Sequence, residues 1–225
     1  MSVKVIAFDV NETLLDLKAL DEHFVALLGD AKYRPLWFAQ MLQLSFVGGL
    51  TGEYVDFRTA QRAALKMVAA RIGVTLSDEQ AATMVDRMTE LPSHPEVPEA
   101  LERLAASPLT VVALVNSLEE VGEAQLTFAG IRQHFDAVIS ADSVRALKPA
   151  AAPYLAVAER YGVSPDEVRL VAAHSWDVSG ALAASLQAAF VARPGAVLSP
   201  IGSQPDIVGA DLTAVADQIL ATDLK

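Results

Sequence analysis

Polar and charged side chains of types that can take part in catalysis or binding follow three apolar runs of this sequence. They are Asp9, Asn11 and Thr13 after residues 3–8, Asn116 and Ser117 after residues 109–115, and His174, Ser175 and Asp177 after residues 168–172. Lys148 stands before Pro149 in a further loop. Four separate segments thus carry carboxylates, amides, an imidazole and an ammonium group. Together these residue types indicate a candidate functional site.

Each of these residues also has an ordinary structural alternative. Asp9 could be a turn residue or a helix cap, Ser117 and Glu120 could form a capping box, and Lys148 could lie on the surface. The chemical interpretation depends on the four segments meeting at one place, which the surrounding elements have to bring about.

The apolar runs predict buried strands of a parallel sheet. Strand-like runs span residues 3–8, 109–115, 168–172 and 188–192, with 135–140 as a further candidate. Helical patterns span residues 96–106, 119–129, 151–161 and 178–186. Near-continuous apolar runs that alternate with helices are typical of parallel α/β folds. Ligands bind at the carboxyl ends of the strands in such sheets, so we expect the polar residues to gather at that edge.

Residues 17–95 have a different pattern and predict a helical insert. Helix-like stretches cover residues 33–46, 53–71 and 78–90, and no convincing strand lies among them. Gly48, Gly49 and Gly52 are expected to separate the first two helices, and Ser77 with Gln80 fits a capping box before the third. We therefore expect an α/β core domain of residues 1–16 and 96–225, with a helical cap domain of residues 17–95.

Composition narrows the class of protein and its partners. The 225 residues include 52% hydrophobic residues, which is typical of a packed globular chain. With 17 basic and 28 acidic residues the net charge is −11, so nucleic acid and anionic membranes are poor partners. The absence of cysteine excludes disulfides, thiolate metal sites and a cysteine nucleophile. No signal peptide or membrane-length apolar run is recognisable, so we expect a cytoplasmic protein.

The order and spacing of four motifs resemble those of the haloacid dehalogenase superfamily. The motifs are Phe-Asp-Val-Asn-Glu-Thr-Leu at 8–14, Leu-Val-Asn-Ser at 114–117, Leu-Lys-Pro at 147–149, and Ala-His-Ser-Trp-Asp-Val-Ser-Gly-Ala at 173–181. The Trp-Asp pair and the helical insert directly after the first motif are similar to the L-2-haloacid dehalogenase (type II) branch. The resemblance covers essentially the whole chain and implies a Rossmannoid parallel sheet flanked by helices, with an inserted cap.

The resemblance also implies roles for individual residues. Asp9 would be the nucleophile that displaces halide and forms an aspartyl ester, Lys148 would keep Asp9 ionised, and Asp177 would orient the hydrolytic water. Thr13 and Asn116 would hold the carboxylate, the leaving group or both. The remaining residues that we expect to contact the substrate or halide are Val10, Asn11, Ser117, His174, Trp176, Trp37 and Phe38. The resemblance makes a homodimer plausible, although no surface pattern establishes one.

Two departures from the phosphatases of this superfamily favour cleavage of a carbon–halogen bond. Phosphatases carry a second Asp two residues after the nucleophile to protonate the alkoxide, whereas this chain has Asn11, and halide needs no acid. Ala173 stands where the phosphatases have an Asp that binds Mg²⁺. We therefore expect no metal and no cofactor. The predicted function is metal-independent hydrolysis of short 2-haloacids through an aspartyl ester.

Other departures leave two alternatives open, a phosphatase of small phosphate esters and a non-catalytic binding protein. Phe38 stands where the dehalogenases have an Arg that grips the anion, and Arg34, one helical turn earlier, is a candidate substitute. Val115 and Ala172 stand in place of serines. His174 replaces an Asn. It could donate to a small leaving group such as fluoride, or it could hydrogen-bond other site residues without contacting the substrate.

Overall fold

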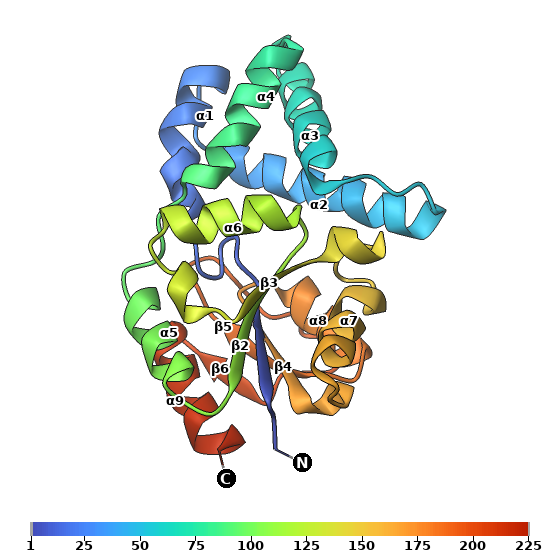
Figure 1. The fold of residues 1–225 in the computed structure, drawn as a ribbon. Coiled ribbons are helices and arrows are strands. Elements are labelled where there is room, and N and C mark those ends of the chain that lie inside the picture. Colours follow the sequence, from blue (N-terminus) through green and yellow to red (C-terminus); the bar gives the residue numbers. More distant parts are fainter. Residues whose placement is uncertain (1, 225) are drawn as a thin grey trace.

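The computed structural model describes residues 2–224, which form a twisted parallel sheet covered by helices on both faces (Figure 1). The strand order is β3-β2-β1-β4-β5-β6, and every neighbouring pair is parallel. The strands are β1 (Val5–Phe8), β2 (Thr110–Val115), β3 (Ala137–Ser140), β4 (Val168–Ala172), β5 (Gln187–Val191) and β6 (Ile207–Gly209). The predicted parallel α/β sheet is confirmed, and the short edge strand β6 is an addition to it.

Alternate side chains of the central strand β1 enter two separate apolar cores. Ile6 and Phe8 of β1 pack into the core beneath α5 (Val97–Ala105), α6 (Glu119–Phe128) and α9 (Leu212–Asp223). Val5 and Ala7 pack into the opposite core. The helices over that second core are α7 (Ala151–Tyr161) and α8 (Ser175–Ala183). Burial on both faces explains why the strands are almost uninterrupted apolar runs.

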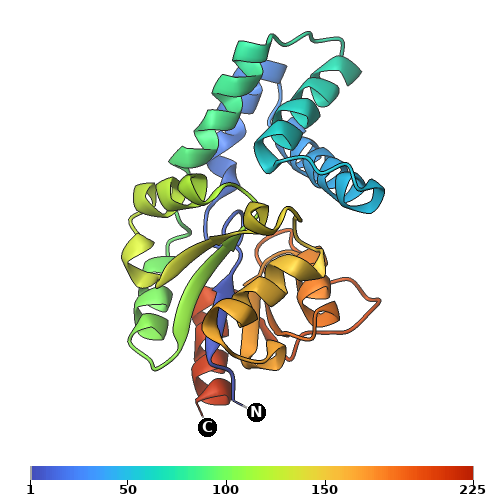
Figure 2. The ribbon, with the colours of Figure 1, turned by 45° about the vertical axis from the view of Figure 1, so that its right-hand side comes forward.

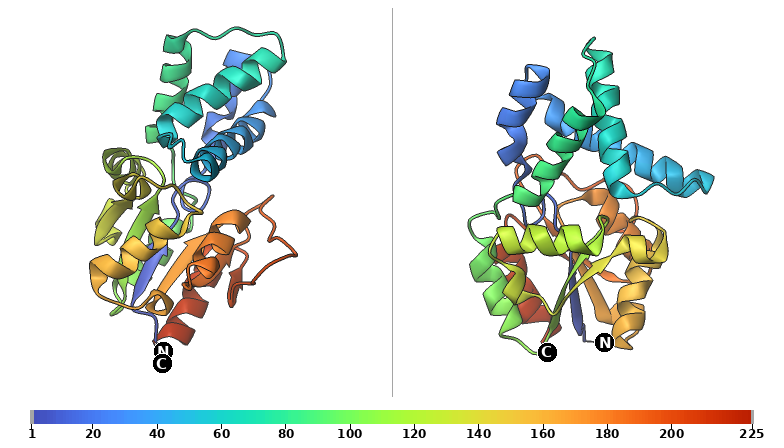
Figure 3. Two further views of the ribbon diagram at one scale, coloured as in Figure 1. Left: turned by 90° about the vertical axis from the view of Figure 1, so that its right-hand side faces the viewer. Right: turned by 45° about the horizontal axis from the view of Figure 1, so that its top comes forward.

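A group of helices stands over the carboxyl edge of the sheet (Figures 2 and 3). These helices are α1 (Asp21–Leu28), α2 (Tyr33–Thr51), α3 (Phe57–Arg71) and α4 (Asp78–Asp86). Short 3₁₀ turns lie at Leu17–Leu20, Arg87–Glu90, Arg132–His134, Ala141–Val144 and Pro165–Glu167. No strand occurs between residues 17 and 95, all of which the structure describes. The helical character predicted for the insert is present, and α1 is an element that the sequence pattern did not indicate.

Helix boundaries within the insert follow local chemistry, with one correction. Gly48 and Gly49 were expected to end the first long helix, but α2 continues through both to Thr51. It ends at Gly52, which adopts a left-handed φ of 77°. Gly48 instead permits close packing, because a Cβ there would lie 2.7 Å from the carbonyl oxygen of Glu53.

The capping box expected at Ser77 is confirmed. At α4, the Ser77 hydroxyl accepts the Gln80 backbone N–H at 3.1 Å, and Gln80 Oε1 accepts the Ser77 backbone N–H at 2.9 Å. The capping box considered as an ordinary role for Ser117 is wrong, since Leu118 caps α6 without a side-chain hydrogen bond and the Ser117 hydroxyl has no hydrogen-bond partner among the residues that the structure describes. Among residues 2–224, no helix combines the length and the apolar character needed to cross a bilayer.

Candidate active site

Three charged side chains from separate elements meet at the carboxyl edge of the sheet. Asp9 directly follows β1, Asp177 lies in the first turn of α8, and Lys148 lies in the loop before α7. Lys148 Nζ donates to Asp9 Oδ1 at 2.9 Å and to Asp177 Oδ2 at 2.6 Å. All three side chains are buried. The structure therefore brings together three of the residues that the sequence analysis expected at this edge, with one ammonium group bridging two carboxylates.

The electrostatics of this bridge prepare Asp9 to act as an anion. Burial alone would raise the pKa of Asp9, but the charge of Lys148 and hydrogen bonds from His174 and Thr13 hold it well below its usual range. Burial would lower the pKa of Lys148, yet the charges of Asp177 and Asp9 raise it. The pKa of Asp177 is raised by burial and by the charge of Asp9, against the opposing effect of Lys148. Asp177 is thus the more basic of the two carboxylates.

Thr13 connects the Asp9 side chain to the residue that follows β4. Its hydroxyl donates to Asp9 Oδ2 at 2.6 Å. The same oxygen accepts the backbone N–H of Ala173 at 2.8 Å. Because the hydroxyl proton is directed at the carboxylate, Thr13 is able to fix the rotation of the Asp9 side chain.

Asn116 positions Lys148 and makes no direct hydrogen bond to Asp9. Its Oδ1 accepts the backbone N–H of Lys148 at 2.8 Å, and its Nδ2 donates to the Lys148 carbonyl at 3.3 Å. This reciprocal pair holds the loop that carries the ammonium group, so the contribution of Asn116 to the site is indirect.

Tyr154 belongs to the site although the sequence analysis did not single it out. Its hydroxyl donates to Asp177 Oδ1 at 2.5 Å from a fully buried position on α7. Burial and the charge of Asp177 raise the pKa of Tyr154, so the hydroxyl keeps its proton. Gly180 allows this approach, because a Cβ there would lie 2.6 Å from the tyrosine oxygen. The sequence did contain a signal for this role, namely a tyrosine on the apolar face of a predicted helix, six residues after Lys148.

His174 lies between two carboxylates. Its Nδ1 is 3.0 Å from Asp9 Oδ2, and its Nε2 is 3.0 Å from Oε2 of Glu12, a residue that the motif analysis did not assign. Burial disfavours the imidazolium, but hydrogen bonds and charges of Asp9 and Glu12 outweigh burial and raise the pKa of His174 to about 9. Both ring nitrogens are engaged, which leaves neither free for a halide in this arrangement.

Two aromatic rings enclose the His174 imidazole. Phe38 stacks on it with ring centroids 5.5 Å apart and an interplanar angle of 18°. Trp176 stacks with centroids 5.2 Å apart and an angle of 26°. Phe38 thus occupies the expected Arg position as an apolar wall against the histidine.

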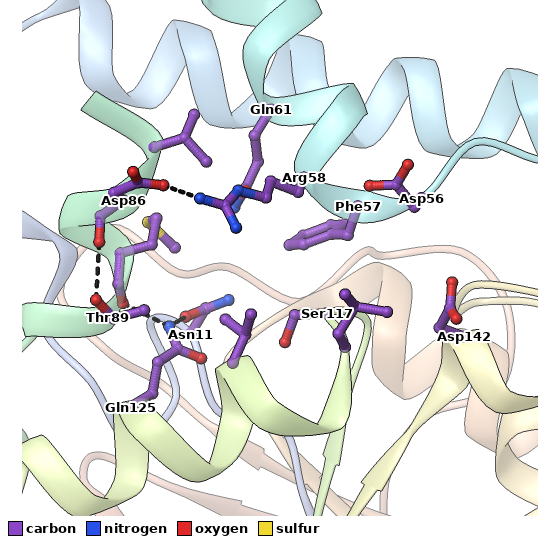
Figure 4. Close-up of a pocket in the computed structure, with 14 residues that line it drawn as sticks. Asn11, Asp56, Phe57, Arg58, Gln61, Asp86, Thr89, Ser117, Gln125 and Asp142 are labelled. Carbon is purple, nitrogen blue, oxygen red and sulfur yellow. Dashed lines mark hydrogen bonds and ion pairs between the residues drawn. The ribbon is translucent and has the colours of Figure 1, made fainter. Parts of the chain in front are cut away.

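A small cavity of about 250 Å³ lies between the helical insert and α6 (Figure 4). Asn11, Ser117 and Gln125 line it from the sheet side, and Phe57 and Arg58 line it from α3. Gln125 Nε2 donates to Asn11 Oδ1 at 2.9 Å. Arg58 forms an ion pair with Asp86, as the dashed line in Figure 4 marks. Asn11, which the sequence analysis placed at the position of a phosphatase's general acid, carries an amide whose N–H protons are not acidic enough to protonate a leaving group.

A larger cavity of about 550 Å³ opens beside His174. Phe38, His174 and Trp176 line it together with Glu12 and Arg34. Arg34, the candidate substitute for the missing arginine, has its Nε 2.6 Å from Asp21 Oδ1 and its Nη1 3.5 Å from Glu12 Oε1. Its charge is therefore already balanced by carboxylates.

Two further residues expected at the site line neither cavity. Val10, which directly follows Asp9, is buried in the apolar core. Trp37 is fully buried, packs against Phe24 with centroids 5.4 Å apart, and donates its indole N–H to the Gln61 carbonyl at 2.9 Å. The structure places both in the packing around the site.

The residues at this edge do not fit a Mg²⁺ site. Among residues 2–224, no three His, Asp or Glu side chains are grouped so that they could hold a metal ion. Ala173 offers no ligand, and the carboxylates of Asp9 and Asp177 already share the Lys148 ammonium group, which would repel a cation. The side chain of Lys148 thus takes the place between Asp9 and Asp177 where a metal ion would otherwise compensate their negative charges.

Comparison with known proteins defines the class. A family model described as haloacid dehalogenase-like hydrolase matches residues 3–185, and the chain belongs to this family. It is 33% identical to an (S)-2-haloacid dehalogenase of Xanthobacter autotrophicus, over 85% of this chain and 76% of that protein. It is 28% identical to haloacetate dehalogenase H-2 of Moraxella sp. (strain B), over 96% of this chain and 98% of that protein.

A solved structure extends the similarity to the whole fold. L-2-haloacid dehalogenase from Xanthobacter autotrophicus with chloropropionic acid covalently bound superimposes with a TM-score of 0.90. The two chains are 27% identical, and the match covers 96% of this chain and 98% of that one. The expected superfamily and its dehalogenase branch are both confirmed as the proteins that this chain resembles.

Proposed function

We propose that this protein is a hydrolytic dehalogenase of short 2-haloacids that acts through an ester on Asp9. The observation that carries the proposal is the Lys148 ammonium group, which bridges the buried carboxylates of Asp9 and Asp177. Asn11, two residues after Asp9, cannot act as a general acid. The relatives named as 2-haloacid and haloacetate dehalogenases support the same substrate class.

In the first step, an Asp9 carboxylate oxygen attacks the carbon that bears the halogen. The carbon–halogen bond breaks as the carbon–oxygen bond forms, and the halide leaves with the electron pair. Lys148 keeps Asp9 ionised for this displacement. Because halide is a weak base, it leaves without being protonated, so an Asn at position 11 does not slow this step. Cleavage of a phosphate ester would be slowed, because its alkoxide leaving group needs a proton.

In the second step, water hydrolyses the aspartyl ester. Asp177, whose pKa is raised by burial, accepts a proton from the water as the water oxygen bonds to the Asp9 carbonyl carbon. Tyr154 and Lys148 each hold one oxygen of Asp177 and so direct it. The hydroxy acid then leaves, and the proton passes to solvent. The neighbour with chloropropionic acid covalently bound supports an ester of this kind.

The division of labour between domains is part of the proposal. Residues 1–16 and 96–225 would form the catalytic core, and residues 17–95 would act as a cap. The aromatic wall supplied by Phe38 and the cavities between the insert and the sheet support this assignment. Such a cap would keep bulk water away from the displacement.

Assembly and location complete the proposal. We infer a homodimer, supported by Val47 and Leu50 on the projecting end of α2, which expose 48% and 87% of their surface. Light scattering at micromolar concentration tests it, and a monomer mass would contradict it. We also infer a cytoplasmic protein, supported by the cysteine-free composition and tested by cell fractionation.

The experiment that tests the function measures halide release from fluoro-, chloro- and bromoacetate and from 2-halopropionates, with and without EDTA. Release should persist in EDTA and disappear in Asp9→Asn. It should be unchanged in Asp217→Asn, which alters an exposed carboxylate paired with Arg103. Intact-mass analysis of Asp177→Asn should show a trapped ester. Mg²⁺-dependent release of phosphate from phosphate esters without halide release would establish the phosphatase alternative, and no ester with any haloacid would favour a binding protein.

A further inference from the structure

Glu12 occupies a backbone position that is costly for its residue type. Its backbone φ of 60° lies in the left-handed region, which is unfavourable for residues other than glycine. The carboxylate is two-thirds buried, with Oε2 on His174 and Oε1 facing Arg34. The backbone carbonyl of Glu12 interacts with His94 Nε2 at 3.2 Å. The loop thus holds a strained residue whose carboxylate faces the site.

The His174 ring that Glu12 contacts has little freedom to reorient. Phe38 and Trp176 both stack with it, and its two nitrogens each lie 3.0 Å from a carboxylate oxygen. A ring fixed in this way presents one N–H to a defined oxygen, Oδ2 of Asp9. The Glu12 carboxylate anchors the opposite nitrogen.

The two oxygens of Asp9 have different surroundings. Oδ1 accepts one hydrogen bond, from Lys148, whereas Oδ2 accepts one from Thr13 and faces His174. The oxygen with fewer donors has the freer lone pairs and is better suited to attack carbon. If Oδ1 attacks, Oδ2 becomes the carbonyl oxygen of the ester, with two donors already aimed at it.

We propose that Glu12 is a positioning residue that holds His174 in place, so that His174 and Thr13 together donate to Oδ2 of Asp9 while the ester is hydrolysed. This inference rests on the proposed function. When water adds to the carbonyl carbon, one water proton goes to Asp177 and the carbonyl electron pair moves onto Oδ2. Collapse restores the carbonyl and breaks the bond from that carbon to Oδ1, which leaves with the hydroxy acid. The proton on the former water oxygen passes to the departing alkoxide, and Asp177 releases its proton to solvent.

Charged groups around His174 set the sign of its pH dependence. Asp9 and Glu12 contact it directly, and Lys148 and Arg34 share those two carboxylates. Other titratable groups around the same cavity are Asp16, Lys18, His94 and Arg193. With a pKa of about 9, His174 is an imidazolium at pH 8. Loss of the Glu12 charge should lower that pKa, so a variant without it should carry a neutral ring at pH 8 and an imidazolium again near pH 6.

The test compares wild type with Glu12→Gln, which keeps an acceptor near Nε2 and removes the charge. Glu12→Gly removes both the acceptor and the charge, and glycine adopts the left-handed backbone without strain. With two variants, a folding defect in one of them does not end the test. Asp21→Asn is the control, because Asp21 contacts Arg34 without touching His174. NMR titration of the His174 ring reports its pKa independently of any haloacid. Rapid quench with chloroacetate or 2-chloropropionate separates ester formation from ester hydrolysis.

We expect both Glu12 variants to lower the His174 pKa by about two units, and Asp21→Asn to leave it unchanged. At pH 8 ester hydrolysis should slow about tenfold or more, and the ester should accumulate. Ester formation should change less than about threefold, since a neutral His174 leaves Asp9 no less nucleophilic. The difference should shrink at pH 6. An unchanged His174 pKa would overturn the charge pairing between Glu12 and His174, whatever the substrate is. Equal slowing of ester formation and ester hydrolysis would overturn the role of Glu12 in hydrolysis. The absence of an ester in the wild type would overturn that role as well.

Discussion

Replacement of Lys148 by Met tests the central electrostatic argument. The ammonium group lies 2.9 Å from Asp9 Oδ1 and 2.6 Å from Asp177 Oδ2 in a buried position. At an effective dielectric constant of about 20, each attraction is about 6 kcal/mol, and desolvation offsets much of it. Removing one partner of such a buried set costs about 3–5 kcal/mol, because the remaining charges are left uncompensated. For a chain of this size that corresponds to a fall in Tm of roughly 6–20 °C.

The loss of stability in Lys148→Met should depend on pH with a definite sign. Without the cation, burial and mutual repulsion raise the pKa values of Asp9 and Asp177 in the folded state above those of the unfolded chain. Protonation then favours the folded state, so the deficit should be largest at pH 8 and smaller at pH 5. Asp177→Asn in the same chain should restore part of the stability, because it removes one buried charge and keeps an acceptor for Tyr154.

The assay is urea unfolding at pH 8 and pH 5 for wild type, Lys148→Met and the double variant. Lys66→Met is the matched control, since it removes a lysine from an exposed ion pair with Asp78 and should cost less than about 1 kcal/mol. A cost for Lys148→Met as small as that of the control would refute the reasoning. So would a cost independent of pH, or a double variant no more stable than the single one.

Three further predictions concern the supports of the site. Gly180→Ala places a Cβ 2.6 Å from the Tyr154 hydroxyl and should destabilise the protein by about 1–3 kcal/mol in urea unfolding; an unchanged midpoint would contradict it. Tyr154→Phe removes the donor to Asp177 Oδ1 and should slow ester hydrolysis about tenfold, with ester visible by mass, whereas equal slowing of ester formation would count against this role. Arg169→Met leaves the buried carboxylate of Asp223 without its cation and should cost about 3–5 kcal/mol. The kcat for halide release should be unchanged in the folded protein, because Arg169 is the second residue of β4 and lies near the end of the sheet away from Asp9; a lower kcat would contradict this.

The sheet was predictable because burial on both faces leaves a strong sequence signal. Runs such as 109–115 and 168–172 are nearly free of polar residues, and each corresponds to a strand of the structure. The three-residue strand β6 has an exposed Val208 in its middle, so its pattern is too short and too mixed to recognise. In α2, the glycines suggested a break that tertiary packing overrides, because Gly48 lies against the carbonyl of Glu53.

The core of the site was predictable for a related reason. Parallel strands end at one edge, so polar residues that follow different strands must meet there, as Asp9 and Asp177 do. The roles of neighbouring residues were less accessible. Asn116 follows β2 as expected, yet it holds the Lys148 backbone, and Trp37 is adjacent to Phe38 in the chain but points into the helical packing. Rotation of a side chain about its helix or loop leaves no pattern in the sequence.

The sequence by itself determined which chemical groups are present and at which edge of the sheet they stand. Asn11 and Ala173 remove the acid and the metal ligand of a phosphatase, and that subtraction needs no coordinates. Only the tertiary structure decided which groups touch. Lys148 is 139 residues from Asp9, and Glu12 is 162 residues from His174, so their contacts depend on how loops from different strands turn toward one another. Hydrogen bonds act over about 3 Å, and placement at that precision arises from the packing of the whole domain.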